Sequence, residues 1–242
     1  FCVVRLTESG DVDEGHLAEL LSAGNVKIVA MAGCSNVLGT VVPVARIARA
    51  AHDAGALFVL DGAQIMRHGV VDLAEFGADY LAFSGHKMMA GTGIGALCGT
   101  REALELLHPR DFGGEMVGEV TQVRTTWEEL PLRLEAGTPN YVGAVALAAA
   151  CDYIDALGRE NVAAYEDDLV AHAMEKLRSV EGLRIAGSPS KRAGLVSFMM
   201  DDVHPLDLCT LVDARGVALR SGHNCAQPAL AWLGETSVAR LS

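Results

Sequence analysis

The sequence predicts an α/β protein, with a partial large domain built on a mostly parallel sheet (residues 1–150) and a smaller C-terminal α+β domain (residues 151–242). Two observations support this prediction. In the first half, short continuous apolar runs alternate with segments of helical periodicity, which is typical of a parallel sheet covered by helices on both faces. In the second half, two long helical segments precede strand-like runs that alternate less regularly with helices, which is typical of an α+β domain.

The chain opens with a strand-like run, residues 1–6, and neither a cap nor a turn precedes it. We therefore expect the sequence to be a piece of a longer protein. The next elements are recognised by their length, by β-branched residues in strands and by the glycines that close helices. In order, they are the strand Val26–Ala32, the helix Val44–Ala54, the strand Leu57–Leu60, the helix Leu73–Phe76, and the strands Tyr80–Phe83 and Ile94–Cys98.

Residues 109–138 look irregular, because they contain Gly-Gly, Thr-Thr and Gly-Thr-Pro motifs and no sustained apolar period. Helical periodicity resumes after them. The elements expected from there on are the helices Val142–Leu157 and Asn161–Val180, the strands Leu183–Ala186 and Leu195–Met200, the helix Pro205–Ala214, the strand Val217–Arg220 and, after a polar loop, a last helix.

The composition argues against several classes of function. The formal net charge of −12 disfavours nucleic-acid binding, which needs a basic surface, and adsorption to an anionic membrane. The longest apolar run, Val142–Cys151, is about half as long as a membrane-spanning helix. No secretion signal opens the sequence. We therefore expect a cytoplasmic protein.

Six cysteines, at positions 2, 34, 98, 151, 209 and 225, form no C-x-x-C pair and no spacing typical of zinc. We expect reduced thiols and no metal site, although His223 with Cys225 could be half of one. Cys225 differs from the others because it lies in a polar loop. The cysteines expected in the core, from their apolar neighbours, are Cys34, Cys98, Cys151 and Cys209.

Polar side chains follow two predicted strands, at the edge where open α/β sheets bind ligands. These clusters are Asp61–Gln64 and Ser84–Lys87, about one strand–helix–strand unit apart. A structural ion pair at the surface would explain a carboxylate and a lysine there. A cofactor with an aldehyde and a pyridine ring would also need both, the lysine for a Schiff base and the acid to keep the ring nitrogen protonated. The two clusters alone leave both interpretations open.

Five segments then occur in order over nearly the whole chain: Ser35–Thr40, Asp61–Gln64, Ser84–Lys87 with Gly91–Gly95, Glu135–Asn140 and Arg220–Pro228. In these segments the chain resembles the aminotransferase class V superfamily, which consists of fold-type I pyridoxal 5′-phosphate-dependent transferases. More narrowly, it is similar to the group II, SufS-like cysteine desulfurases and selenocysteine lyases.

The resemblance implies a role for each matching residue around the cofactor. Lys87 forms the Schiff base and later moves protons, Asp61 pairs with the pyridinium nitrogen, and Gln64 bonds the phenolic oxygen. Ser84 and His86 contact the cofactor phosphate.

The resemblance also implies residues for the substrate and for the partner subunit. Asn36 and Arg240 hold the substrate carboxylate, and the planar fork of arginine suits both carboxylate oxygens. Thr138 reaches the cofactor phosphate of the partner subunit, which implies a homodimer. Cys225 is the nucleophile that takes the sulfur, and an adjacent imidazole can favour its thiolate.

The sequence departs from the family pattern in two ways. The family loop usually reads His-His before the cysteine, whereas this chain has His223-Asn224, and asparagine is neither an acid nor a base. Family members also carry a long N-terminal part with a phosphate-binding threonine loop and a histidine that stacks on the pyridine ring, and nothing here matches either. We therefore expect the 242-residue chain by itself to be inactive.

The activity implied by the resemblance is conversion of L-cysteine to L-alanine, with the sulfur held as a persulfide on Cys225. An acceptor protein of the SufE or SufU kind would take that sulfur for iron–sulfur cluster assembly. Selenocysteine lyase activity, on L-selenocysteine, is the alternative on the same scaffold. A kynureninase or an epimerase would leave the cysteine loop without a purpose. A non-enzymatic remnant or interaction module is disfavoured because Asp61, Gln64, Lys87 and Cys225 are intact.

Three other features are interpreted as structural. Gly91–Gly95 precedes a strand and does not join a strand to a helix, so a dinucleotide-binding loop is disfavoured. His68 is expected to be solvated at a loop edge. Glu166–Asp168 is expected to be a solvated helix face.

Overall fold

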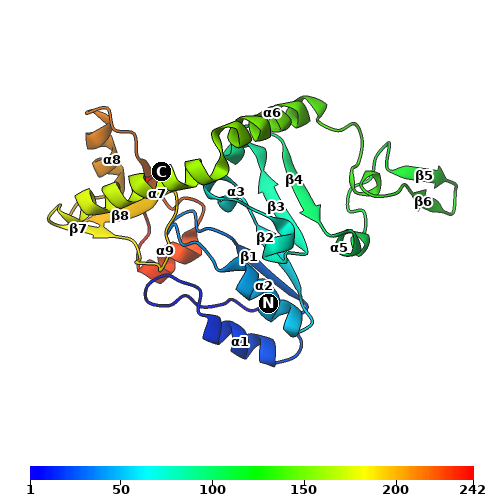
Figure 1. Cartoon of the computed structure of the whole chain (residues 1–242), viewed down its shortest axis with the longest axis horizontal. Helices are drawn as coiled ribbons and strands as arrows, with labels where there is room; N and C mark the ends of the chain where they lie inside the picture. Colours follow the sequence, from blue (N-terminus) through cyan, green and yellow to red (C-terminus); the bar gives the residue numbers. More distant parts are fainter.

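The computed structural model describes residues 1–242 and contains two four-stranded sheets and a separate hairpin (Figure 1). In the first sheet, β1, β2 and β3 are parallel as predicted, but β4 runs antiparallel to β3. The segment between β3 and β4, residues 85–94, is shorter than a parallel crossover needs, so the chain turns straight back. These strands are β1 (Ile28–Ala32), β2 (Leu57–Asp61), β3 (Tyr80–Ser84) and β4 (Gly95–Gly99).

Helices cover one face of this sheet. Helix α2 (Val44–Asp53) buries an apolar stripe with the i, i+3, i+4, i+7 spacing of an amphipathic helix. Its partners include Phe58 and Leu60, which are fully buried on β2. Helix α1 (Glu14–Ser22) adds Leu17 and Leu21 to the same core. The α2 residues of the stripe are Val44, Ile47, Ala48 and Ala51.

Helices are also expected on the opposite face of the first sheet, but apolar side chains are exposed there. The strand register places Ile28 and Leu97 on this face, and these side chains are 59% and 50% exposed. Because side chains alternate along a strand, Asp61 projects on the same face as Leu57 and Val59. Tyr80 also lies on this face and is buried, so residues 1–242 cover the face in part and not throughout as expected.

Two long helices lead from the first sheet to the second. Helices α6 (Tyr141–Leu157) and α7 (Arg159–Arg178) are separated by Gly158, whose φ is +81°, and are bent by 73°. Neither helix is long and apolar enough to cross a membrane alone, while the bent pair meets that test of length and composition together. Residue 150, the predicted domain boundary, lies within α6, and the division there stays a prediction.

The second sheet is antiparallel, in the order β7-β8-β10-β9. Two details differ from the prediction. The strand expected at Val217–Arg220 is Arg220–Gly222, because the Val217 amide still bonds Val212 O at the end of α8. The last residues of the sequence also form a strand, β10, which the periodicity of the sequence did not predict. The elements are β7 (Leu183–Ile185), β8 (Val196–Met200), α8 (Pro205–Asp213), β9 (Arg220–Gly222), α9 (Gln227–Leu233) and β10 (Val238–Leu241).

Two further segments differ from the predictions. Residues 1–6 form no strand, and Leu6 makes only an isolated bridge to Val12. Residues 109–138, expected to be irregular, contain a hairpin that projects away from both sheets (Figure 1). Phe112 stacks on Trp127 of that hairpin, with 5.6 Å between ring centroids. The elements between β4 and α6 are α5 (Arg101–Glu105), β5 (Val117–Val120), β6 (Thr125–Trp127) and the 3₁₀ turn η2 (Leu132–Leu134).

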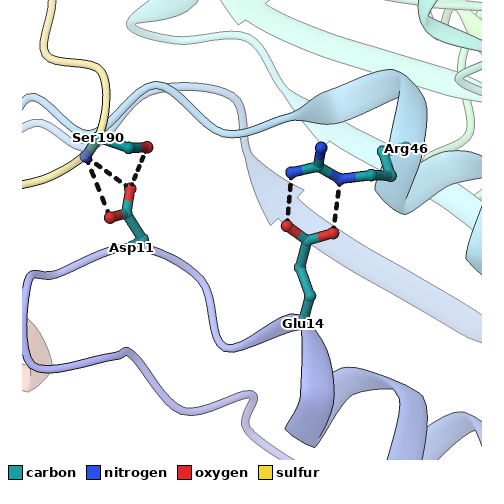
Figure 2. Close-up of polar contacts among 4 residues, drawn as sticks. All are labelled: Asp11, Glu14, Arg46 and Ser190. Carbon is teal, nitrogen blue, oxygen red and sulfur yellow. Dashed lines mark hydrogen bonds and ion pairs between the residues drawn. The ribbon is translucent and has the colours of Figure 1, made fainter.

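Polar contacts anchor the start of α1 and the segment before it to two distant parts of the chain (Figure 2). The Asp11 carboxylate accepts hydrogen bonds from the backbone and side chain of Ser190, at 3.0 and 2.9 Å. Burial raises the pKa of Asp11, but hydrogen bonds from Ser9 and Ser190 outweigh it and lower the pKa below its usual value. Glu14 binds the Arg46 guanidinium through both carboxylate oxygens, at 2.6 Å each. The segment is therefore held against both α2 and the loop before β8.

His68 is buried, contrary to the expectation of a solvated side chain. It ends helix α3 (Ile65–His68), its side chain is 2% exposed, and Nδ1 lies 2.6 Å from Glu166 Oε2 on α7. Glu166 is only 18% exposed, so the expectation of a solvated helix face is wrong for this residue, whereas Asp167 and Asp168 are exposed as expected. Sequence spacing could not show this pair, because 98 residues separate the partners. The pair ties α3, which directly follows Gln64, to α7.

Gly194 is the residue against which the His68 ring packs, and its replacement should destabilise the fold. A Cβ on Gly194 would lie 2.0 Å from His68 Cε1, and its φ is +67°. We expect Gly194→Ala to reduce the free energy of unfolding by about 3 kcal/mol, from overpacking and left-handed strain together. Chemical denaturation measures this. Gly216→Ala is the control, because its φ is +81° but no atom lies within 4 Å. Equal losses in the two variants would contradict a packing effect.

Candidate active site

The carboxyl ends of three parallel strands meet at one edge of the first sheet. Ala32 is in register with Asp61, and Asp61 is in register with Ala82. The segments that follow these strands carry Asn36, then Gln64, then Lys87 on the 3₁₀ turn η1 (Gly85–Met88). Topology thus gathers polar residues from distant parts of the chain, at the position where open α/β sheets bind ligands.

A cavity of about 390 Å³ lies at this edge. That volume is within the usual range for small-molecule and cofactor sites. The remainder of its wall includes residues of the N-terminal segment and Ala229 of α9. The residues predicted for the site that line it are Asn36, Asp61, Gln64, Lys87 and Cys225.

Asp61 and Lys87 share this cavity without forming an ion pair. One Asp61 oxygen accepts a hydrogen bond from the Ala63 amide at 2.8 Å, which fixes the carboxylate at the strand end. Gly62 allows the close turn between Asp61 and Gln64, because a Cβ there would lie 2.5 Å from Leu81 Cδ1. A structural ion pair therefore does not account for the carboxylate and the lysine.

Three predicted phosphate contacts lie outside this cavity wall. Ser84 Oγ and His86 Nδ1 lie 2.9 Å apart and bind each other. Thr138 is exposed in the segment before α6, close to Asn140, whose side chain donates to Gly93 O at 3.0 Å. The structure thus places Ser84 and His86 together beside Lys87 and does not bring Thr138 to them.

Arg240, on β10, is joined to the cavity through Asn36. Its Nη1 donates to Asn36 O at 3.0 Å, while Nε is buried and has no partner. Burial lowers the pKa of Arg240, and the positive charges of Arg220 and Arg67 lower it further. No carboxylate forms an ion pair with Arg240 or with Arg220, its cross-strand neighbour. Such a site suits an anion that accepts a hydrogen bond from Arg240 Nε and neutralises the guanidinium charge.

Cys225 is exposed, as predicted, in a loop with unusual backbone geometry. Asn224 and Cys225 have φ values of +49° and +59°, two consecutive left-handed residues that are not glycine. Each such residue stores strain of about 1–3 kcal/mol, which is found mostly at functional sites. The Cys225 amide donates to His223 Nδ1 at 3.1 Å, and Asn224 O accepts from Asn36 Nδ2. The last contact joins residues 188 positions apart, and no pattern in the sequence could have shown it.

The cysteines differ in burial, and two of the predicted core positions are wrong. Cys34 and Cys209 are buried as expected, but Cys98 is exposed and Cys151 is half-buried. Cys98 lies on β4, at the uncovered edge of the first sheet, where an apolar run does not become core. An apolar neighbourhood in the sequence therefore did not decide which thiols are accessible.

Alkylation should distinguish Cys225 from Cys34. Burial, and then the charge of Glu166, raises the pKa of Cys34 to about 12. At pH 8 only about one Cys34 thiol in ten thousand is ionised, and the thiolate is the reactive form. We expect iodoacetamide to label Cys225 and spare Cys34 in the native protein, and to label both in urea, as peptide mapping would show. Labelling of native Cys34 at the Cys225 rate would contradict its burial.

Comparisons with known proteins agree with this geometry. The aminotransferase class-V family model matches residues 2–242. A probable cysteine desulfurase of Halalkalibacterium halodurans is 48% identical over 89% of this chain and 53% of its own length. A cysteine desulfurase of Haloferax volcanii is 43% identical over 99% of this chain and 56% of its own length. The chain thus spans little more than half of these relatives.

Solved structures show the same fold. A cysteine desulfurase from Thermococcus onnurineus superposes with a TM-score of 0.94, at 35% identity, over 100% of this chain and 60% of that one. The cysteine desulfurase CsdA of Escherichia coli, in an S-sulfonic acid form, gives a TM-score of 0.93 at 36% identity, over 98% and 59%. The predicted α/β fold of the fold-type I transferases is therefore confirmed. With the family model covering nearly its whole length, the chain belongs to the aminotransferase class-V family.

Proposed function

We propose that this chain is the part of a pyridoxal 5′-phosphate-dependent cysteine desulfurase that carries the cofactor lysine and the sulfur-accepting cysteine. The observation that carries the proposal is one cavity lined by Asp61, Gln64, Lys87 and Cys225. An acid, an amide, an amine and an accessible thiol from three separate segments share it. The similarity to cysteine desulfurases of three organisms supports the same activity.

The residues present fit pyridoxal 5′-phosphate. Asp61 would pair with the pyridinium nitrogen, Gln64 would donate to the phenolic oxygen, and Lys87 would bind the aldehyde carbon. We further propose that Ser84 and His86 hold the phosphate. When bound, the cofactor supplies an electron sink that stabilises negative charge at the substrate Cα.

The chain's own residues would bind and orient L-cysteine. The Arg240 guanidinium, which has an unpaired buried Nε, and the Asn36 amide would hold the carboxylate. Lys87, which lines the same cavity from η1, would take the proton from Cα and later return one. These contacts orient the substrate thiol toward Cys225, and proximity of this kind lowers the barrier substantially.

Cys225 would accept the sulfur. Its thiolate attacks the substrate sulfur, an S–S bond forms, and the Cβ–S bond breaks with its electron pair going to the carbon fragment. Protonation of that fragment gives L-alanine and leaves a persulfide on Cys225. Exposure of Cys225 supports transfer to a second protein, and we propose an acceptor of the SufE or SufU kind in iron–sulfur cluster assembly. Thr138, exposed before α6, is proposed to reach the cofactor phosphate of the partner subunit in a homodimer.

The test is the formation of alanine and sulfide from L-cysteine, with pyridoxal phosphate and a reductant present. The product of the complete reading frame and residues 1–242 alone are assayed side by side. Alanine and sulfide in equal amounts from the complete product support the proposal, whether or not the shorter chain is active. Cofactor binding by the complete product without any formation of alanine would overturn it.

A further inference from the structure

Asn36 joins the two halves of the proposed substrate site. Its Nδ2 donates to the main-chain oxygen of Asn224, the residue before Cys225. Its own main-chain oxygen accepts from Arg240 Nη1 at 3.0 Å. Asn36 lines the cavity and therefore lies between the cysteine loop and the Arg240 guanidinium, and the orientation of its side-chain amide depends on where the Asn224 carbonyl points.

The direction of that carbonyl depends on the backbone of residue 224. Asn224 has a φ of +49°, and asparagine adopts left-handed geometry more readily than other residues that carry a Cβ. Its side chain stays within its own loop, since Nδ2 donates to Gly222 O at 3.2 Å. Oδ1 is buried without a partner, and the residue is 6% exposed. Asn224 therefore accepts the hydrogen bond from Asn36 Nδ2 through its main-chain oxygen and not through its side chain.

We propose that Asn224 is a positioning residue for substrate binding: its left-handed backbone aims a carbonyl at Asn36 and thereby orients the Asn36 amide toward the substrate carboxylate. An amide has two N–H groups. The Asn224 carbonyl holds one, and the other is left for a carboxylate oxygen beside Arg240. Fixing a recognition group before the ligand arrives strengthens binding, because no ordering cost remains to be met. The inference rests on the proposed function, which assigns the carboxylate to Asn36 and Arg240.

A matched pair of variants separates the backbone from the side chain. Asn224→Gly and Asn224→Ala both remove the amide and keep the carbonyl, but only glycine tolerates the left-handed conformation without strain. Affinity for L-alanine, the product of the proposed reaction, is measured by titration calorimetry on the product of the complete reading frame, loaded with pyridoxal phosphate. We expect Asn224→Gly to bind within about twofold of the unchanged protein and Asn224→Ala to bind about fivefold or more weakly. Equal weakening in both would overturn the proposal and assign the effect to the lost hydrogen bond from Asn224 Nδ2 to Gly222 O.

Asn36→Ala and the double variant Asn36→Ala/Asn224→Ala complete a cycle. If Asn224 acts through Asn36, the double variant binds L-alanine no more weakly than Asn36→Ala. Additive losses would overturn the proposal. L-Alaninamide, which lacks the carboxylate, should bind equally to the unchanged protein and to Asn224→Ala, and a parallel loss would show general damage and overturn the proposal as well.

Hydrogen exchange provides a readout that does not depend on the folding of Asn224→Ala. In Asn36→Ala, amides 222–226 should exchange faster, because the carbonyl that anchors the loop has lost its donor. An unchanged exchange rate of amides 222–226 in Asn36→Ala would show that Asn36 does not hold the cysteine loop and would overturn the proposal. Failure of the unchanged protein to bind L-alanine at all would overturn the proposed function together with this inference. Normal binding by the unchanged protein, with equal affinities of Asn224→Gly and Asn224→Ala for L-alanine, would overturn only the inference.

Discussion

Replacing Lys87 by alanine should abolish covalent attachment of pyridoxal phosphate and reduce alanine formation by roughly 10³-fold or more. Lys87 provides the amine of the cavity and stands beside Asp61, Gln64 and Cys225. The fold should persist, because Lys87 is half-buried and forms no ion pair. The measurements are the visible absorbance of the protein with added cofactor and its thermal unfolding.

Borohydride reduction followed by peptide mapping identifies the attachment site directly. The label should appear on Lys87 in the unchanged protein and disappear in Lys87→Ala. Lys191→Ala is the matched control, because Lys191 lines a different cavity and should leave the label in place. Label on Lys27, Lys176 or Lys191 would refute the assignment.

Replacing Cys225 by serine should leave cofactor binding intact and eliminate sulfide release from L-cysteine, again by roughly 10³-fold or more. Serine keeps the size of the side chain but is a far weaker nucleophile toward sulfur. Activity on L-selenocysteine should decline less, because selenium leaves more readily and depends less on the thiol. Mass spectrometry of the unchanged protein during turnover should find a persulfide on Cys225.

Cys98→Ser is the matched control for that variant. Cys98 is also exposed, but it lies on β4 and does not line the cavity. Its replacement should leave sulfide release unchanged. Full desulfuration by Cys225→Ser, or loss of it in Cys98→Ser, would show that Cys225 is not the sulfur acceptor.

Much of the first sheet and of its ligand-binding edge could be predicted because the determinants are local. Strands β1, β2 and β3 appear as short apolar runs, and polar residues directly follow them. The rule that parallel strands share a carboxyl edge then places Asp61 near Lys87. The same reasoning missed the antiparallel course of β4, because direction depends on the length of the connection and not on the composition of the strand.

The contacts that complete the site lie beyond local patterns. Arg240 was matched by resemblance alone, and the strand that carries it was not predicted, since its four residues have no clear period. Its bond to Asn36 spans 204 residues. The contact that buries His68 against Glu166 joins residues 98 positions apart. The residues next to His68 in the sequence indicated a solvated side chain instead.

The sequence by itself therefore determined the α/β class, the ligand edge of the first sheet and the chemistry of the groups at it, because periodicity, strand ends and residue type are properties of short segments. Only the tertiary structure decided which thiols are accessible, that Arg240 has an unpaired donor, and that the Asn224 carbonyl holds Asn36. Those outcomes depend on which distant surfaces meet and exclude water. Burial, buried hydrogen-bonding groups without partners, and residues strained in the left-handed conformation arise only in the folded chain.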